Sequence, residues 1–199
     1  MPKDQQQPQQ KTIAPGTVVQ RSILFERTAI DETSRTVQLA FASETPYERF
    51  FGIEILDCAP TSMRMGRLTS GGPLLADHNS RDQIGVVESV SIGADRVARA
   101  VVRFGKSARA SEFFQDVVDG IRRNVSVGYQ IHAAQLVETR DGVDTYRVTD
   151  WEPMEVSIVS VPADTTVGVG RSVDAPQAPV IVSANPHQPV LNRKESNVT

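Results

Sequence analysis

Short apolar runs, in which hydrophobic and polar positions alternate or β-branched residues follow one another, make up the middle of this chain. Runs of this kind between turn residues predict β-strands. The turn residues at 31–34, 93–95 and 141–142 predict hairpins between the runs that flank them. We expect strands at 23–25, 36–41, 50–56, 85–92, 97–104, 125–136, 146–148 and 156–161.

One segment departs from this pattern and predicts a helix. Ser107 or Ser111 can cap its start, and Gly120 is placed to stop it. The predicted fold is therefore mostly β with packed helices (α+β). Between cap and stop, apolar residues recur at helical spacing and are expected to pack on the core: Ala110, Phe113, Phe114, Val117, Val118 and Ile121.

The two ends of the sequence differ from the middle. Residues 1–19 are rich in Gln and Pro, and prolines recur among polar residues from 172 onward. Such segments bury too little apolar surface to offset the entropy of ordering. We therefore expect an N-terminal tail at 1–19, a folded domain at 20–171 and a Pro-rich C-terminal tail at 172–199. Within that tail, 180–182 could dock as a short strand.

Composition restricts the classes of function. The chain has 199 residues, 39% of them hydrophobic and 23% charged, which is typical of a soluble globular protein. A net charge of -3 argues against a nucleic-acid partner. No apolar run has the length of a bilayer span, and the N-terminus lacks the apolar core of a secretory signal, so we expect a cytoplasmic protein without a membrane partner.

The sequence offers little support for a disulfide, a metal site or a phosphate-binding site. The single cysteine, Cys58, excludes an internal disulfide and is best explained as a small apolar filler. Neither a carboxylate cluster with metal-ligand spacing nor a glycine-rich phosphate loop is present, so no cofactor or metal is expected. Arg122 and Arg123 are best explained as a solvated helix end rather than as a binding site for an acidic substrate.

Three segments carry the candidate chemistry. His78 follows an apolar pair, Ser126 begins a β-branched strand next to Gly128, and Glu155 opens an apolar strand. A serine, a histidine and an acid are the parts of an activated hydroxyl nucleophile. Taken singly, Ser126 is typical of an ordinary strand serine and His78 of a structural histidine. His132 and His187 are weaker candidates for the base, and Glu152 and Asp150 remain alternatives for the acid.

These segments, in this order, resemble those of the prohead (capsid maturation) proteases of tailed bacteriophages, which are related to the herpesvirus assembly proteases. The resemblance covers about 23–171. It rests on an apolar pair leading to His78 and a short "IG" strand, a helix ending in Asp119-Gly120, the segment Val125–Tyr129, and the closing strand from Trp151 to Ala163.

The resemblance implies an antiparallel β-barrel of the herpesvirus-assemblin-like type. It implies Ser126 as nucleophile and His78 as general base and acid. Glu155 stands where the herpesvirus relatives have a second histidine, and Asn79 stands where an acidic residue commonly follows the base. Oxyanion donors are expected near 161–166, and a helix of the herpesvirus relatives contributes to a homodimer, so a homodimer is allowed.

The function that this resemblance implies is a serine endopeptidase acting through an acyl-enzyme. Its substrates would be the scaffold and major capsid proteins of a phage, together with its own tails, and its place the assembling prohead in the bacterial host cytoplasm. The alternative is a catalytically inert scaffolding or capsid-binding module of the same fold, which the departure at Glu155 would favour.

Overall fold

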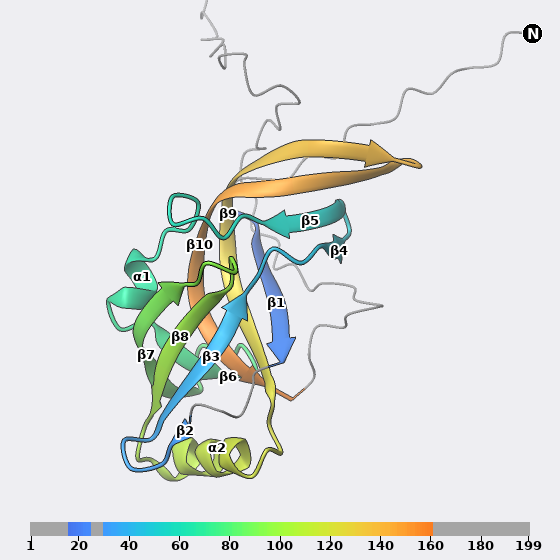
Figure 1. Ribbon diagram of the computed structural model, residues 1–199. Helices are drawn as coiled ribbons and strands as arrows, with labels where there is room; N and C mark the ends of the chain where they lie inside the picture. Colours follow the sequence, from blue (N-terminus) through green and yellow to red (C-terminus); the bar gives the residue numbers. More distant parts are fainter. Residues whose placement is uncertain (1–15, 25–29, 161–199) are drawn as a thin grey trace, which may run out of the picture.

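The computed structural model describes residues 16–24 and 30–160, which form a ten-stranded sheet with two helices (Figure 1). The expected oxyanion segment and the expected C-terminal tail therefore lie outside the described residues. So does the expected N-terminal tail, except for its residues 16–19. The strands are β1 (Val18–Leu24), β2 (Ile30–Asp31), β3 (Thr36–Ala42), β4 (Tyr47–Arg49), β5 (Gly52–Leu56), β6 (Pro73–Ala76), β7 (Gln83–Ile92), β8 (Ala98–Phe104), β9 (Asn124–Arg140) and β10 (Val143–Val159), and the helices are α1 (Gly66–Thr69) and α2 (Ala108–Val118).

The order of strands corrects the predicted closed antiparallel barrel. Hydrogen-bonded neighbours follow the path β1-β9-β10-β6-β7-β8-β3-β2, and the path does not close in the part of the chain that is described. β10 also runs parallel to two of its neighbours, β5 and β6. The fold is mostly β with few helices, as predicted, but the sheet is open and mixed rather than an antiparallel barrel.

Two predicted pairings also require correction. Residues 23 and 24 do not form a hairpin with the strand at 36–41: they belong to β1, which pairs with β9, and the short β2 takes the place beside β3. The predicted strands at 146–148 and 156–161 are not separate: residues 146–148 and 156–159 belong to one strand, β10. β10 stays continuous because register shifts, one of them between Pro153 and Glu155, accommodate irregular residues without ending the pairing.

The hairpin and turn predictions based on local sequence are confirmed elsewhere. β7 and β8 pair across the predicted turn, and β9 turns into β10 at Asp141 and Gly142, both with positive φ (51° and 79°). An Asp-Gly pair suits this turn because both central residues of a type I′ turn need positive φ. The halves of β9 and β10 next to this turn extend to one side as a long arm (Figure 1), and β5 pairs with β10 along it.

Helix α2 is the predicted helix. Ser107 caps it, its Oγ accepting from the N–H of Ala110 at 3.2 Å, and Gly120 follows with a φ of 72°. Phe113, Phe114 and Val117 are buried, as the stripe predicted, whereas Ile121 lies beyond the helix and is 72% exposed.

The apolar faces of the strands pack into one core around Trp151, Tyr129 and Phe104, and Cys58 is buried within it as the expected filler. On β9, Val125, Val127 and Tyr129 point into this core. Because successive strand residues face opposite ways, Ser126 and Gly128 lie on the other face of the sheet. No helix within residues 16–24 and 30–160 is long and apolar enough to span a membrane.

Candidate active site

His78 lies in a tight turn directly after β6. Within the turn, the N–H of Asn79 donates to the carbonyl of Ala76 at 2.9 Å, and the N–H of Ala76 donates to the carbonyl of Asp82 at 3.0 Å. Asp77 and His78 both have left-handed backbone conformations, with φ of 48° and 58°. Such conformations cost on the order of 1–3 kcal/mol each in non-glycine residues and persist only where the surroundings hold them in place.

The carboxylate of Glu155 holds the His78 ring. Glu155 Oε1 lies 2.7 Å from His78 Nδ1, and both side chains are largely buried, at 13% and 16% exposure. With Nδ1 donating to Glu155, the neutral ring carries its lone pair on Nε2, the nitrogen that can take a proton from a nucleophile.

The two alternative acids are engaged elsewhere. Glu152 pairs with Arg67 at 3.3 Å and lies 3.6 Å from His132, and Asp150 forms a two-pronged pair with Arg64 at 2.7 and 2.6 Å. Of the three carboxylates considered from the sequence, Glu155 is therefore the one placed against His78.

Ser126 sits on the strand next to this pair. In the register of β9 with β10 it lies directly opposite Ser157, and Gly128 lies opposite Glu155. Side chains directly opposite in an antiparallel pair point to the same face. Ser126 is 1% exposed, and its Oγ has no hydrogen-bond partner within the described residues. The fold thus brings Ser126 to the face that carries Glu155, but no hydrogen bond joins Ser126 to His78 in this conformation.

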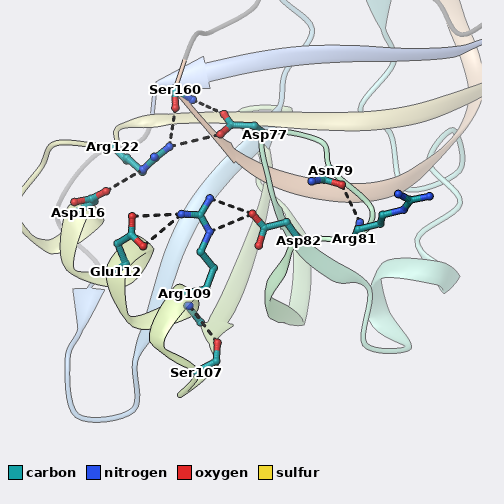
Figure 2. A network of polar contacts seen from close by, with 11 residues as sticks. Asp77, Asn79, Arg81, Asp82, Ser107, Arg109, Glu112, Asp116, Arg122 and Ser160 are labelled. Carbon is teal, nitrogen blue, oxygen red and sulfur yellow. Dashed lines mark hydrogen bonds and ion pairs between the residues drawn. The ribbon is translucent and has the colours of Figure 1, made fainter.

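A network of ion pairs anchors the His78 turn to α2 and to the end of β10 (Figure 2). Asp77 Oδ1 accepts the backbone N–H of Ser160 at 2.7 Å, and Arg122 donates to Ser160 Oγ at 2.7 Å and to Asp116 at 3.0 Å. Asp77 Oδ2 also lies 3.7 Å from Arg122. The predicted solvated helix end is therefore wrong for Arg122, which ties three elements together.

The other end of the turn is anchored by Asp82. Its carboxylate accepts from Arg109 of α2 at 3.1 and 3.2 Å, and this contact raises the pKa of the Arg109 guanidinium above its ordinary value. The guanidinium groups of Arg109 and Arg122 both lie over the buried ring of Phe113, at 4.5 and 4.0 Å from its centroid. Helix α2 thus holds both ends of the turn that carries His78.

Sequence reasoning missed Asp77, Arg122 and Ser157 as parts of the site. One signal was available for Ser157: it lies two residues beyond Glu155, and alternate residues of a strand share a face. No comparable local signal connects Arg122 to the site, because its partners Asp77 and Ser160 lie far away in the sequence. Among residues 16–24 and 30–160, no three His, Cys, Asp or Glu side chains are grouped in a way that could hold a metal ion.

Comparison with known proteins identifies the family. The model of the caudovirus prohead serine proteases matches residues 63–177, more than half of the chain. The chain belongs to this family. The match takes in His78, Ser126 and Glu155, and membership supports a protease role in capsid maturation.

Individual proteins are also similar to this chain. The major capsid protein of Halomonas phage phiHAP-1 is 49% identical over 140 residues, 68% of this chain and 23% of the relative. The chain therefore spans about a quarter of that relative's length. Among solved structures, the capsid assembly protease of bacteriophage T4 aligns with a TM-score of 0.48 and 9% identity, over 73% of this chain and 98% of that one.

Proposed function

We propose that this chain is a serine endopeptidase that cleaves scaffold and capsid proteins, and its own tails, inside an assembling phage prohead. Ser126 is the nucleophile, His78 the general base and acid, and Glu155 the group that orients the imidazole. The observation that carries the proposal is the 2.7 Å contact between His78 Nδ1 and Glu155 Oε1. Glu155 lies on the face of the sheet that also carries Ser126.

The mechanism follows from the role of each group. Ser126 Oγ attacks the scissile carbonyl as His78 Nε2 accepts its proton, and the new carbon–oxygen bond gives a tetrahedral intermediate. His78 gives that proton to the amine nitrogen as the carbon–nitrogen bond breaks, which leaves the acyl-enzyme. Water then releases the acyl group by the same route in reverse. Glu155 stabilises the imidazolium that exists between the two proton transfers.

This mechanism requires Ser126 and His78 to come within hydrogen-bond distance when substrate binds. Catalytic hydrogen bonds are often absent or long without substrate and tighten in the Michaelis complex. The Ser126 Oγ has no competing hydrogen bond among the described residues, so its side chain can rotate without breaking one.

The burial of Ser126 favours a second candidate function, that of an inert capsid-binding module of the same fold. A hydroxyl that is 1% exposed cannot meet a peptide unless its cover moves. The two functions differ in one measurable property, which is whether Ser126 ever forms a covalent bond.

The experiment incubates the purified chain with its scaffold and capsid proteins and follows cleavage by mass spectrometry, together with fluorophosphonate labelling of Ser126. Wild type should cleave and be labelled, and Ser126→Ala should lose about 10⁶-fold in rate while staying folded. Ser89→Ala, a change at an exposed serine on β7, should behave as wild type. Cleavage that persists in Ser126→Ala would overturn the assignment of Ser126 as the nucleophile, whereas an unlabelled and inert wild type would favour the binding module.

A further inference from the structure

The hydroxyl of Ser157 connects the two residues that are to act as base and orienting acid. Ser157 Oγ donates to Glu155 Oε2 at 2.5 Å and accepts the backbone N–H of His78 at 3.2 Å. A serine hydroxyl has one proton to donate and two lone pairs to accept with. Its single proton is thus used on the carboxylate, and one of its lone pairs holds the main chain of the base.

Two hydrogen bonds fix the orientation of the Glu155 carboxylate, one to each of its oxygens. Glu155 Oε1 faces the His78 ring and Oε2 faces Ser157, so the carboxylate cannot turn about its last bond without losing one of the two hydrogen bonds. The carboxylate occupies the space left by Gly128, which lies opposite Glu155 and has no side chain. Ser157 is the contact that keeps Oε1 pointed at Nδ1.

Ser157 also holds the backbone on which the imidazole is mounted. His78 has a φ of 58°, a conformation that non-glycine residues keep only when neighbours hold it. Two hydrogen bonds to β10 stabilise this conformation. The N–H of His78 donates to Ser157 Oγ, and the N–H of Asp77 donates to the carbonyl of Ile158 at 3.0 Å. β10 therefore sets the position of both the ring and its carboxylate partner.

We propose that Ser157 is a positioning residue of the active site, which holds Glu155 and His78 in the geometry for proton transfer to and from Ser126. The proposal rests on the proposed function. Ser157 is not itself the nucleophile: it is fully buried and its proton is bonded to a carboxylate rather than to an imidazole nitrogen. It acts through Glu155 and His78.

Ser157→Ala, Ser157→Cys and Ser157→Thr test the proposal in the full chain, with Ser89→Ala as the control. Ser157→Ala should lower kcat about 10- to 100-fold and leave KM unchanged, because substrate contacts remain while the base loses its alignment. Ser157→Thr keeps the hydroxyl and should recover most of kcat. Ser157→Cys keeps a side chain of similar size but donates only a weak hydrogen bond. Its kcat should therefore lie between those of Ser157→Ala and wild type.

Proton NMR supplies a readout independent of turnover. The imidazole N–H held by Glu155 should give a downfield signal in wild type and in Ser126→Ala, and that signal should broaden or be lost in Ser157→Ala. An inactive wild type with this NMR pattern would overturn the endopeptidase function and leave the positioning contact standing. An active wild type whose Ser157→Ala variant keeps both kcat and the signal, or a Thr variant no better than Ala, would overturn the positioning role alone.

Discussion

Glu155 fills the space that a side chain on Gly128 would occupy. A β-carbon built on Gly128 would lie 2.3 Å from Glu155 Oε1 and 3.2 Å from its carboxyl carbon. Gly128 lies opposite Glu155 in the register of β9 and β10, two residues from Ser126. The absence of a side chain at 128 is therefore what lets the carboxylate reach the imidazole of His78.

Gly128→Ala should reduce activity without unfolding the chain. The new methyl group meets the far end of a flexible side chain, so Glu155 can move, but Oε1 then leaves its position 2.7 Å from His78 Nδ1. A misplacement of about 1 Å can cost about 10²-fold in rate. We expect that loss in kcat with a melting temperature close to that of wild type. Gly66→Ala is the control because open space surrounds Gly66, and a Gly128→Ala enzyme of normal kcat would contradict this account.

Arg122→Ala should loosen the turn that carries His78. Arg122 joins Asp116 of α2 to Ser160 at the end of β10, and Ser160 in turn holds Asp77. Without this anchor, the amides of 77–79 should exchange with solvent faster and kcat should fall. Arg123→Ala is the neighbouring control, since its guanidinium donates to the carbonyl of Gly120 at the helix end. Equal amide exchange in the two variants would show that the anchor has no effect on the turn.

The parts of the fold that local sequence predicted are those stabilised by local contacts. The β7–β8 hairpin, α2 with its Ser107 cap and the Asp141-Gly142 turn are set by residues close together in the chain. The pairing of β1 with β9 and the parallel neighbours of β10 join distant segments, and no local pattern specifies them. The antiparallel barrel was expected from the family resemblance rather than from local sequence, and the order of strands corrects it.

In the candidate active site, too, local sequence could not predict the contacts between segments that are distant in the chain. His78 and Glu155 are 77 positions apart, and the resemblance to a family, rather than spacing, selected them. The choice of Glu155 over Glu152 depended on which strand position faces the turn after β6, a matter of register. Arg122 was assigned to a solvated helix end because the helix dipole favours a cation there. Its partners Asp77 and Ser160 become neighbours only when β6 and β10 pair.

A buried ionic group on the far side of the core gives a stability prediction. Arg49 lies 3.3 Å from Glu54 and donates to Tyr129 at 2.7 Å, and Tyr129 also donates to Glu54. Burial alone would lower the pKa of Arg49, but Tyr129 and Glu54 outweigh it and raise the pKa above its ordinary value. Removal of one partner from a buried pair typically costs about 3–5 kcal/mol, because the other charge stays buried.

Arg49→Met should therefore lower the free energy of unfolding by about 3–5 kcal/mol in urea. The double variant Arg49→Met/Glu54→Leu should recover much of this loss, since no unpaired charge remains. Arg64→Met breaks an ion pair with Asp150 whose side chains are 54% and 33% exposed, and should lower the free energy of unfolding much less than Arg49→Met does. A double variant less stable than Arg49→Met would contradict the assignment of the loss to an unpaired Glu54.

Glu44 should make stability depend on acid pH. Its carboxylate accepts from Arg96 at 2.8 Å, Arg147 at 3.2 Å and the N–H of Cys58 at 3.1 Å. Burial opposes ionisation of Glu44, but the donors from Arg147, Arg96 and Cys58 outweigh it and lower its pKa below 4.5. Because the folded-state pKa is the lower one, this stabilisation is present above pH 4.5 and is lost as pH falls through the folded-state pKa.

Glu44→Gln should thus be less stable than wild type at pH 7, where hydrogen bonds to a charged group contribute about 1.5–3 kcal/mol. The difference should shrink in urea titrations as the pH falls below 4.5, the ordinary pKa of the side chain, and should be smallest below the lowered folded-state pKa, where wild-type Glu44 is neutral as well. Glu32→Gln changes an exposed carboxyl in the β2–β3 turn and should leave the difference from wild type near zero at each pH. If the Glu44→Gln deficit stayed constant from pH 7 to pH 3, packing or hydrogen bonding rather than the charge of Glu44 would account for it.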